Sequence, residues 1–295
     1  MKAIILAGGS GSRLYPLTQV SSKQLQAVYD KPMIYYPLTI LIAAGIRELC
    51  LITTPHDLAR FQGLLGDGTA WGISIEYRQQ ARPAGIAQAF LIAEDFIAGD
   101  DVVLMLGDNV FSGGDDIPRA ISAFRGGATI FAYQVKHPER YGVVEFDRDG
   151  RPLSIEEKPA RPKSAHAVPG VYIYDAQVAA IARGVAPSPR GELEITDVNL
   201  EYMRRGQLRV HRLSRGFAWL DAGTSSALQE ASSYIETIER RQGVKIGCPE
   251  EAALVRGFLN IEQFEALLER IPHCEYRDYL AGVAAEARGL ENKHA

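Results

Sequence analysis

A short apolar run that ends in a glycine-rich loop is the feature that most constrains this chain. Residues Ala3–Ala7 have the pattern of a buried strand, and Gly8, Gly9 and Gly11 follow it at once. Glycines at the end of a strand let backbone N–H groups approach a phosphate chain, because no Cβ atom stands in the way. We therefore expect an α/β protein that binds phosphate in the loop after its first strand.

Strand patterns and helix patterns alternate through the first half of the chain. The apolar runs predict buried strands at Ala3–Ala7, Leu49–Thr53, Ile73–Tyr77, Val102–Leu106 and Thr129–Gln134. The spacing of apolar residues over 86–97 predicts a helix between two of them. This alternation predicts right-handed βαβ units in a doubly wound, mostly parallel sheet, whose ligands bind at the carboxyl ends of the strands.

The middle of the chain has a different pattern. Strand patterns at Gly142–Phe146, Leu153–Glu156 and Val168–Tyr174 follow one another with turns between them. They predict a β-hairpin or meander insertion rather than another βαβ unit. Helical patterns dominate afterwards, so we divide the chain into a main domain, 1–242, and a C-terminal helical extension, 243–295.

Composition excludes several classes of protein. The net charge is −4 and no basic run is present, which argues against nucleic-acid binding. No eighteen-residue apolar stretch could span a membrane, and the first apolar run is too short for a signal peptide. The three cysteines are scattered and match no zinc or disulfide pattern. We expect a soluble, cytoplasmic protein that binds neither nucleic acid nor membranes.

The glycine loop does not match the two common phosphate-binding loops. A dinucleotide-binding fingerprint needs a third glycine where Leu14 stands, and an acidic residue after the second strand, where Thr53 and Thr54 stand. A Walker A loop needs a lysine directly after its last glycine, but the nearest downstream lysine is Lys23. The loop therefore matches neither type. A dehydrogenase would need the dinucleotide-binding fingerprint, so it ranks third among the hypotheses for this chain, after those given below.

Further motifs follow the glycine loop in a fixed order. The loop itself fits the pattern G-G-x-G-[ST]-R-L, with Lys23 about ten residues further on. The motifs after it are Val28–Pro37, Leu106–Asn109, Tyr141–Val143, Ile155–Pro159, Arg190–Asp197 and Ala218–Asp221. Together they resemble the sugar nucleotidyltransferases, and among these the glucose-1-phosphate thymidylyltransferases. The resemblance implies a Rossmann-like nucleotidyltransferase fold over 1–242, a sugar-binding part at about 141–221, and a homotetramer.

The resemblance also implies the reaction and its partners. Glucose 1-phosphate would attack the α-phosphorus of dTTP and release pyrophosphate, with Mg²⁺ as cofactor. Such a reaction depends on positioning and on cations that stabilise negative charge. The catalytic cations that it implies are Arg13, Lys23 and Lys158. The nucleotide-binding residues that it implies are Leu6, Gly8, Gly9, Gly11, Ser12, Gln80 and Gly85.

Base recognition is assigned to Gln80 and Gly85 by resemblance. An amide side chain can accept a hydrogen bond from N3–H of thymine and donate one to a carbonyl of the same base. Gly85, five residues after Gln80, would let the backbone approach the base. Uracil has the same imide edge, so these residues do not exclude UTP.

Carboxylates follow two apolar runs, at Asp108 and Asp221. Mg²⁺ prefers one or two carboxylates together with substrate phosphates, so these two residues are the predicted metal ligands. Glu157 and Lys158 suit a sugar phosphate, because a carboxylate accepts hydrogen bonds from hydroxyl groups and an ammonium binds phosphate. The sugar-phosphate site that the resemblance implies comprises Tyr141, Gly142, Glu157, Lys158, Val168, Arg190 and Glu192.

Two alternatives remain open from the sequence. An enzyme of the same class could use UTP or another hexose 1-phosphate. A non-catalytic subunit of the same fold could sense a sugar nucleotide, but that hypothesis predicts the loss of Arg13, Asp108 or Asp221, and all three are present.

Overall fold

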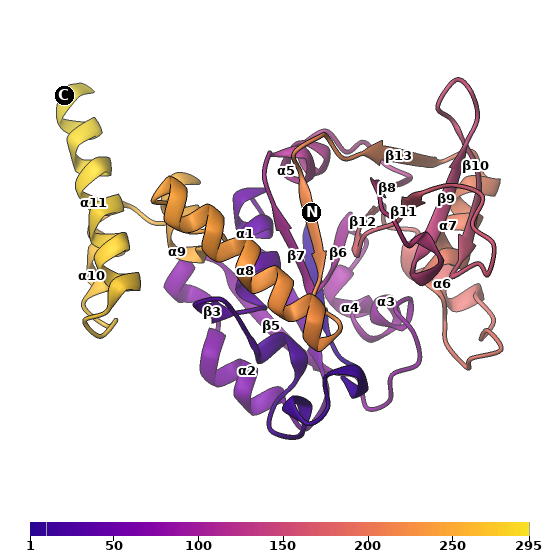
Figure 1. Ribbon diagram of the computed structural model, residues 1–295, viewed down its shortest axis with the longest axis horizontal. Helices are drawn as coiled ribbons and strands as arrows, with labels where there is room; N and C mark the ends of the chain where they lie inside the picture. The colour runs from indigo at the N-terminus through magenta and orange to yellow at the C-terminus, as the bar shows by residue number, and fades with distance from the viewer. Residues whose placement is uncertain (10, 295) are drawn as a thin grey trace.

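The strands of the central sheet are apolar on both faces, so both faces need helices to cover them. The computed structural model describes residues 1–9 and 11–294 and shows this arrangement (Figure 1). The predicted parallel strands are present as β1 (Lys2–Ala7), β4 (Glu48–Thr53), β5 (Ser74–Gln79), β6 (Val102–Leu106) and β8 (Ala128–Gln134). Of these, β6, β1, β4 and β5 lie side by side and pair in parallel, which confirms the predicted doubly wound sheet.

An antiparallel strand separates β6 from β8 in this sheet. The full order is β10-β9-β11-β8-β12-β6-β1-β4-β5, with β13 (Leu208–Arg212) parallel to β8 outside that path. The strand β12 (Val171–Tyr174) lies between β6 and β8 and is antiparallel to both. It begins three residues later than the sequence pattern predicted, after Pro169, which lacks the N–H that a strand ladder needs.

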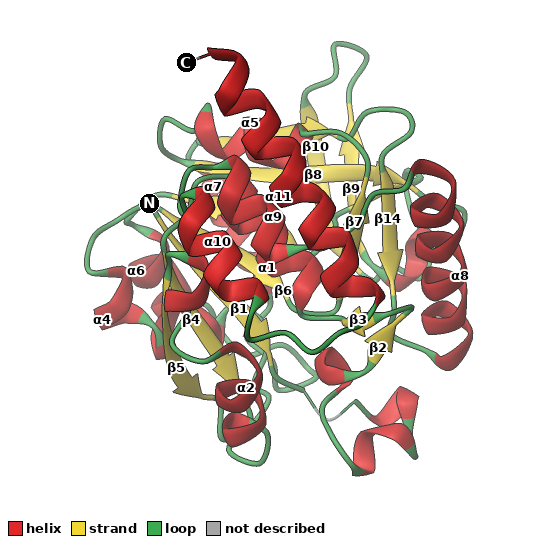
Figure 2. Cartoon of the chain, turned by 90° about the vertical axis from the view of Figure 1, so that its left-hand side faces the viewer, coloured by secondary structure: helices red, strands yellow, loops and turns green. Residues whose placement is uncertain are grey.

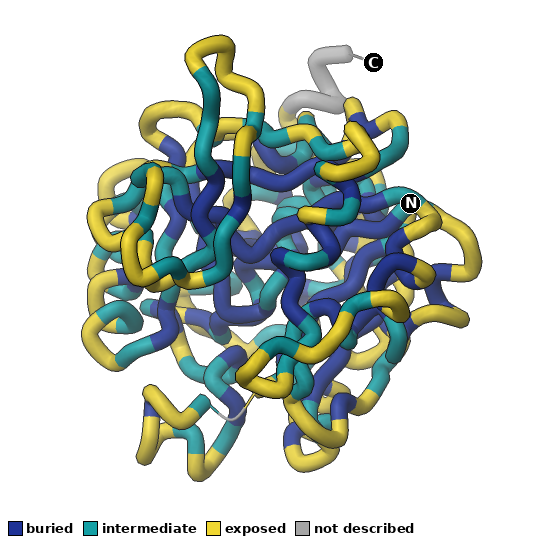
Figure 3. Tube along the Cα trace, turned by 90° about the vertical axis from the view of Figure 1, so that its right-hand side faces the viewer, coloured by how far each residue is buried: buried dark blue, intermediate teal, exposed yellow. Residues whose placement is uncertain are grey.

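The predicted meander extends the sheet beyond β8. It consists of β9 (Gly142–Phe146), β10 (Pro152–Glu157) and the short β11 (His166–Ala167), all in antiparallel pairs. Figure 3 shows this end of the molecule, where the exposed loops surround a buried centre. The insertion therefore forms one continuous sheet with the parallel strands.

Alternate residues of each strand belong to two separate apolar layers. Ala3 and Ile5 of β1 pack on the side covered by α1 (Tyr35–Ala43), α2 (Leu58–Leu65), α5 (Asp116–Ser122) and α9 (Pro249–Val255). Ile4 and Leu6 pack on the side covered by α3 (Gln88–Ile92), α4 (Glu94–Ile97), α6 (Val178–Gly184) and α7 (Ile195–Arg204). Successive side chains of a strand point to opposite faces, so the apolar run of β1 supports both layers. The single helix predicted over 86–97 is divided in two at Ala93.

The part of the chain that was predicted to be a C-terminal extension is helical where it is described, and its helices pack beside α1. After α8 (Ser225–Gln242), the described part of the extension contains α9, α10 (Ile261–Leu268) and α11 (Glu275–His294). Figure 2 shows α9, α10 and α11 in front of the sheet, beside α1. Leu38 of α1, Ala253 of α9 and Phe264 of α10 belong to the same apolar core. Among the described helices, none is long and apolar enough to cross a membrane.

Candidate active site

The carboxyl ends of β1 and β6 bring the glycine loop and the first predicted metal ligand together. Leu6 pairs with Leu106 in the parallel ladder, and the Gly107 N–H donates to the Leu6 carbonyl at 2.9 Å. Asp108 therefore lies beside the start of the glycine loop at Gly8. This is the edge of a parallel sheet at which ligands bind.

A small second sheet brings the other predicted metal ligand to the same place. The strand β7 (Asn109–Ser112) directly follows Asp108, and β14 (Ala218–Asp221) pairs with it in antiparallel register. Asp221 lies opposite Asn109 in that register. The pairing of β7 with β14 thus places both carboxylates at one edge of the large sheet, although they are far apart in the sequence.

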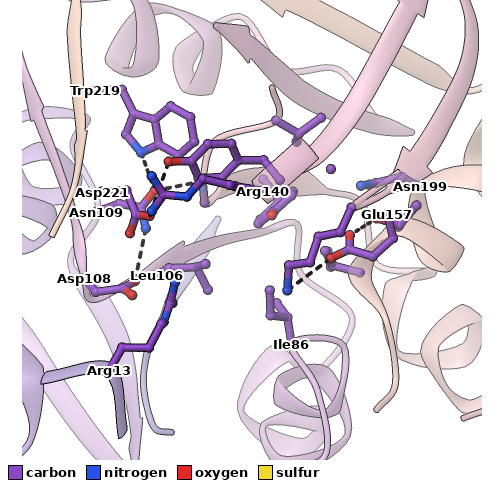
Figure 4. Close-up of a pocket in the computed structure, with 18 residues that line it drawn as sticks. Arg13, Ile86, Leu106, Asp108, Asn109, Arg140, Glu157, Asn199, Trp219 and Asp221 are labelled. Atoms are coloured by element: carbon purple, nitrogen blue, oxygen red, sulfur yellow. Dashed lines mark hydrogen bonds and ion pairs between the residues drawn. The ribbon is translucent and has the colours of Figure 1, made fainter. Parts of the chain in front are cut away.

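A cavity of about 390 Å³ opens at this edge (Figure 4). Eight of the sequence-predicted residues line it: Arg13, Asp108, Tyr141, Gly142, Glu157, Lys158, Val168 and Asp221. A smaller cavity of about 190 Å³ is lined by Gly9, Gly11, Ser12, Arg13, Lys23 and Gly223. Arg13 lines both cavities, so it stands where the glycine loop meets the larger cavity. Leu6, Gly8, Gln80, Gly85, Arg190 and Glu192 line neither.

Several residues of the large cavity were not assigned a role from the sequence. They include Asn109, Arg140, Tyr172, Thr196, Asn199 and Trp219. Asn109, Thr196 and Trp219 lie inside motifs that carried the resemblance, so position within a motif was the signal that could have found them. Asn199 and Tyr172 lie on α7 and β12, and only the fold directs them into the cavity.

Asp108 is held in its ionised form by its neighbours. The Lys23 ammonium contacts Asp108 Oδ2, and Asn109 Nδ2 donates to Asp108 Oδ1 at 3.0 Å. Burial by itself would raise the pKa of Asp108, but the Lys23 charge and these two hydrogen bonds outweigh it and lower the pKa. Asp108 is therefore an anion with a cationic partner at neutral pH.

Asp221 has the opposite shift. Burial and the nearby charge of Asp108 raise the pKa of Asp221, against the opposing effect of Arg13, Lys23 and Arg140. A Cβ atom on Gly223 would lie 3.0 Å from Asp221 Oδ1 and 3.2 Å from an Arg13 guanidinium nitrogen. The absence of a side chain at Gly223 therefore lets the carboxylate and the guanidinium approach each other.

The two carboxylates fit a hard divalent cation. Burial and the charge of Asp108 raise the pKa of Asp221, and a bound cation would oppose both effects. Within residues 1–9 and 11–294, no group of three or more His, Cys, Asp or Glu side chains could hold a metal. An ion here would need further ligands from water or from substrate phosphates, and that is the coordination that Mg²⁺ prefers.

The Asn109 carboxamide is oriented by two donors from other segments. Its Oδ1 accepts from the Gly170 backbone N–H at 3.0 Å and from Trp219 Nε1 at 2.6 Å. Both groups can only donate, so the oxygen must face them and the amino group must face Asp108. Trp219 also packs on the Tyr141 ring, with 4.9 Å between ring centroids, and the Tyr141 hydroxyl lies 3.4 Å from Asp221 Oδ2.

The opposite wall of the cavity is formed by the meander and α7. Glu157 accepts a hydrogen bond from the Thr196 hydroxyl at 2.6 Å and lies 3.6 Å from the Lys158 ammonium. Figure 4 shows Glu157 and Asn199 across the cavity from Asp108 and Asp221. A cation and a hydrogen-bonded carboxylate therefore face the two acidic residues across an open space.

Arg190 and Glu192 lie beyond this wall rather than on it. Arg190 contacts Glu157 at 3.4 Å and Glu192 at 3.5 Å, while Glu194 holds it at 2.9 Å. Arg190 therefore contacts Glu157 from outside the cavity.

Gly85 is required by close packing of two loops. Its φ of +102° suits glycine, and a Cβ atom there would lie 2.3 Å from the Leu193 carbonyl oxygen. Leu193 N–H also donates to the Ala84 carbonyl at 2.7 Å. The contact with Leu193 is a sufficient reason for glycine at this position, whether or not a base approaches it.

The chain is similar to known proteins over nearly its whole length. A family model described as nucleotidyl transferase matches residues 2–238. A relative from Xanthomonas campestris pv. campestris, named glucose-1-phosphate thymidylyltransferase, is 52% identical over 96% of this chain and 97% of its own length. A relative of the same name from an Actinoplanes species is 53% identical over 97% of this chain and 95% of its own length.

Solved structures give a similar result. A structure from Bacillus anthracis, assigned to the same enzyme and in complex with sucrose, shares 42% identity with a TM-score of 0.74. It is matched over 79% of this chain and 94% of its own length. A UDP-glucose pyrophosphorylase structure, at 21% identity and a TM-score of 0.70, shares the fold.

Proposed function

The chain belongs to the nucleotidyl transferase family, and on that premise we propose that it transfers a thymidylyl group from dTTP to α-D-glucose 1-phosphate. The products are dTDP-glucose and pyrophosphate. The observation that carries the proposal is that Asp108 and Asp221 line one cavity, together with Arg13 of the glycine loop and Lys158. The names of the relatives, at about half identity over nearly the whole chain, support the choice of nucleotide and sugar.

The chemistry needs no protein nucleophile. A phosphate oxygen of glucose 1-phosphate, already an anion, forms a bond to the α-phosphorus of dTTP. The bond from that phosphorus to the bridging oxygen breaks, and pyrophosphate leaves with the electron pair. Positioning and stabilisation of the growing negative charge are therefore the main tasks of the protein.

The triphosphate would bind at the smaller cavity. Backbone N–H groups of the glycine loop can approach the phosphates there, because Gly9 and Gly11 have no Cβ atom and adopt positive φ. Arg13 reaches both cavities, so its guanidinium suits the α-phosphate between the two substrates. Lys23 lines the same cavity and is the second cation for the triphosphate.

Asp108 and Asp221 would hold the divalent cation, for which we propose Mg²⁺. Its charge would stabilise the negative charge that grows on the phosphate oxygens during the reaction. In the chain as described, Lys23 neutralises Asp108. This pairing keeps a buried carboxylate ionised and available as a ligand.

Glucose 1-phosphate would bind at the wall formed by the meander. Glu157, held by Thr196, can accept hydrogen bonds from the sugar hydroxyls, and the Lys158 ammonium can bind the phosphate. Arg190 lies behind Glu157 and supports its position with a charged contact. Gly142 lines the same cavity, and a Cβ atom there would make ordinary contact with Glu157 Oε2 at 3.5 Å.

The C-terminal helices offer a surface for the proposed homotetramer. Val255 is 77% exposed and Val244 is 41% exposed, and both line an apolar depression beside Tyr279 of α11. Contact between copies would cover these side chains. Light scattering coupled to size exclusion measures the mass directly, and a monomeric mass would contradict this part of the proposal.

The reaction is tested by pyrophosphate release. The purified chain with Mg²⁺ is given dTTP, UTP, ATP, CTP or GTP against glucose 1-phosphate and other hexose 1-phosphates. We expect release with dTTP and glucose 1-phosphate, lost in Asp108→Ala and kept in Asp149→Ala, which changes an exposed aspartate of the hairpin turn. Absence of release with every pair, from folded protein, contradicts the proposal, and faster release with UTP shifts the nucleotide assignment.

A further inference from the structure

Gln80 lies directly behind the glycine loop, as the last buried polar side chain before the loop of Gly85. It follows β5 and is 4% exposed, and its backbone N–H donates to the Thr53 carbonyl at 2.8 Å. A Cβ atom on Gly8 would lie 2.4 Å from Gln80 Oε1. The carboxamide oxygen therefore points at the backbone of the glycine loop.

The orientation of that carboxamide is set by Gln88, the first residue of α3. Gln80 Nε2 donates to Gln88 Oε1 at 2.8 Å, and Gln88 Oε1 also accepts from the Ala84 backbone N–H at 3.3 Å. A backbone N–H can only donate, so Gln88 must present its oxygen to Ala84, and Gln80 must present its amino group to that oxygen. Gln80 Nε2 also lies 3.5 Å from the Gly85 carbonyl, which can only accept. Two backbone groups thus determine which way both amides face.

The other edge of Gln80 has no partner within the described chain. Its Oε1 accepts no hydrogen bond from residues 1–9 or 11–294. Among the described residues, the fully enclosed side-chain atoms without a hydrogen-bond partner do not include Gln80 Oε1. An acceptor oxygen without a donor among the described residues, beside a phosphate-binding loop, suits a donor of the ligand.

We propose that Gln88 is a positioning residue for base selection: it makes Gln80 an acceptor only, and so favours bases with an imide N–H over cytosine. The inference rests on the proposed function and on the base-recognition role that the family resemblance implies for Gln80. Both N–H groups of Gln80 are directed to Gln88 and Gly85. Gln80 therefore has no N–H left to donate to a base carbonyl, although donation was expected from the sequence.

The selection follows from the donors of the base. Thymine and uracil carry a hydrogen at N3, which Gln80 Oε1 can accept. Cytosine has a lone pair at N3, so two acceptors would face each other and the hydrogen bond would be lost. A site that meets the wrong base with an unpaired polar group discriminates against it.

The test compares nucleotides that differ at one edge only. Calorimetry with Mg²⁺ and no sugar phosphate measures binding of dTTP, dUTP and dCTP to the wild-type chain, Gln88→Met and Gln88→Glu. The dUTP to dCTP affinity ratio reports the imide edge, and the dTTP to dUTP ratio reports the methyl group. Gln88→Met keeps the length of the side chain without an acceptor, whereas Gln88→Glu keeps acceptor oxygens for Gln80 and Ala84.

We expect the wild-type chain to prefer dUTP over dCTP by about tenfold or more, the worth of one hydrogen bond and its unpaired alternative. In Gln88→Met the dUTP to dCTP affinity ratio should fall about tenfold, whereas in Gln88→Glu it should stay at the wild-type value. The dTTP to dUTP ratio should stay the same in all three proteins. This last comparison separates a turned amide from a general loosening of the site, which would reduce both ratios.

An unchanged dUTP to dCTP ratio in folded Gln88→Met overturns the inference, and so does an equal loss in Gln88→Glu. A wild-type chain that binds dUTP and dCTP equally also overturns it. Failure of the proposed function looks different: the nucleotides bind with the expected ratios, but no pyrophosphate is released with any sugar phosphate.

Discussion

Replacement of Asn109 by Asp tests the arrangement of the acidic site. In the wild-type chain Asn109 Nδ2 donates to Asp108 Oδ1 at 3.0 Å, while its oxygen accepts from Gly170 N–H and Trp219 Nε1. Asn109→Asp keeps the oxygen for the two donors and puts a second carboxylate oxygen where the amino group was. The change therefore converts a hydrogen bond into a contact between like charges, with almost no change of shape.

The size of the effect follows from that distance. Two unit charges 3.0 Å apart repel by about 5.5 kcal/mol at an effective dielectric constant of about 20. The Lys23 ammonium on the other oxygen of Asp108 offsets part of this repulsion. We expect Asn109→Asp to lower the free energy of unfolding by roughly 3 kcal/mol at pH 8.

The direction in which the free energy of unfolding changes with pH distinguishes repulsion between two carboxylates from other causes. The wild-type Asp108 carboxyl has a lowered pKa, so its contribution to stability is present above the ordinary carboxyl range and is lost as the pH falls. In Asn109→Asp the pair shares a proton, which raises one pKa above its ordinary value of about 3.9. The folded variant then binds more protons than the unfolded chain, so its stability falls as the pH rises from 5 to 8.

Urea unfolding at pH 5 and pH 8, with a chelator and without nucleotide, measures both effects. Asn109→Ala is the control, because it leaves the Gly170 and Trp219 donors without an acceptor and adds no charge. It should cost about 2–4 kcal/mol at both pH values. The reasoning is refuted if Asn109→Asp and Asn109→Ala lose stability equally at pH 5 and pH 8.

Four further substitutions, one of them a control, test other parts of the structure. Arg190→Met should raise KM for glucose 1-phosphate about tenfold and leave KM for dTTP unchanged in steady-state assays, unless Arg190 serves the nucleotide. Lys31→Met leaves the buried Glu239 short of a partner, and urea unfolding should show a loss of about 3 kcal/mol. The exposed Arg240→Met should cost less than about 1 kcal/mol, and equal losses would contradict the role of burial. Trp219→Phe keeps an aromatic ring but removes the donor to Asn109, which in turn orients toward Asp108. The affinity for Mn²⁺, measured by electron paramagnetic resonance, should fall about fivefold. Unchanged affinity would refute a role of Trp219 in positioning the metal ligand.

Local patterns in the sequence determined the parallel half of the fold. The apolar run of β1 predicted a strand buried on both faces, because burial on two faces leaves no polar alternation. The glycines after it predicted a phosphate loop, since their freedom from Cβ atoms is a property of the residues themselves. Both kinds of signal act within a few residues, so they can be found without the tertiary structure.

The sequence also determined which residue types were available for the site. Asp108, Asp221, Arg13 and Lys158 were found through motifs, and all four line the large cavity. The pattern could not show that β12 lies antiparallel between β6 and β8, because strand order depends on long-range pairing. The same pairing places Tyr172 on the wall of the cavity.

Only the tertiary structure decided the orientation of the amides. The oxygen of Asn109 faces Gly170 and Trp219, which are distant in the sequence, and that contact directs the amino group to Asp108. Gln80 is oriented by Gln88 in a similar way. A carboxamide can turn either edge to a ligand, and its choice depends on donors and acceptors that the folded chain brings together. Residue types therefore follow from the sequence, whereas their hydrogen-bonding roles follow from the fold.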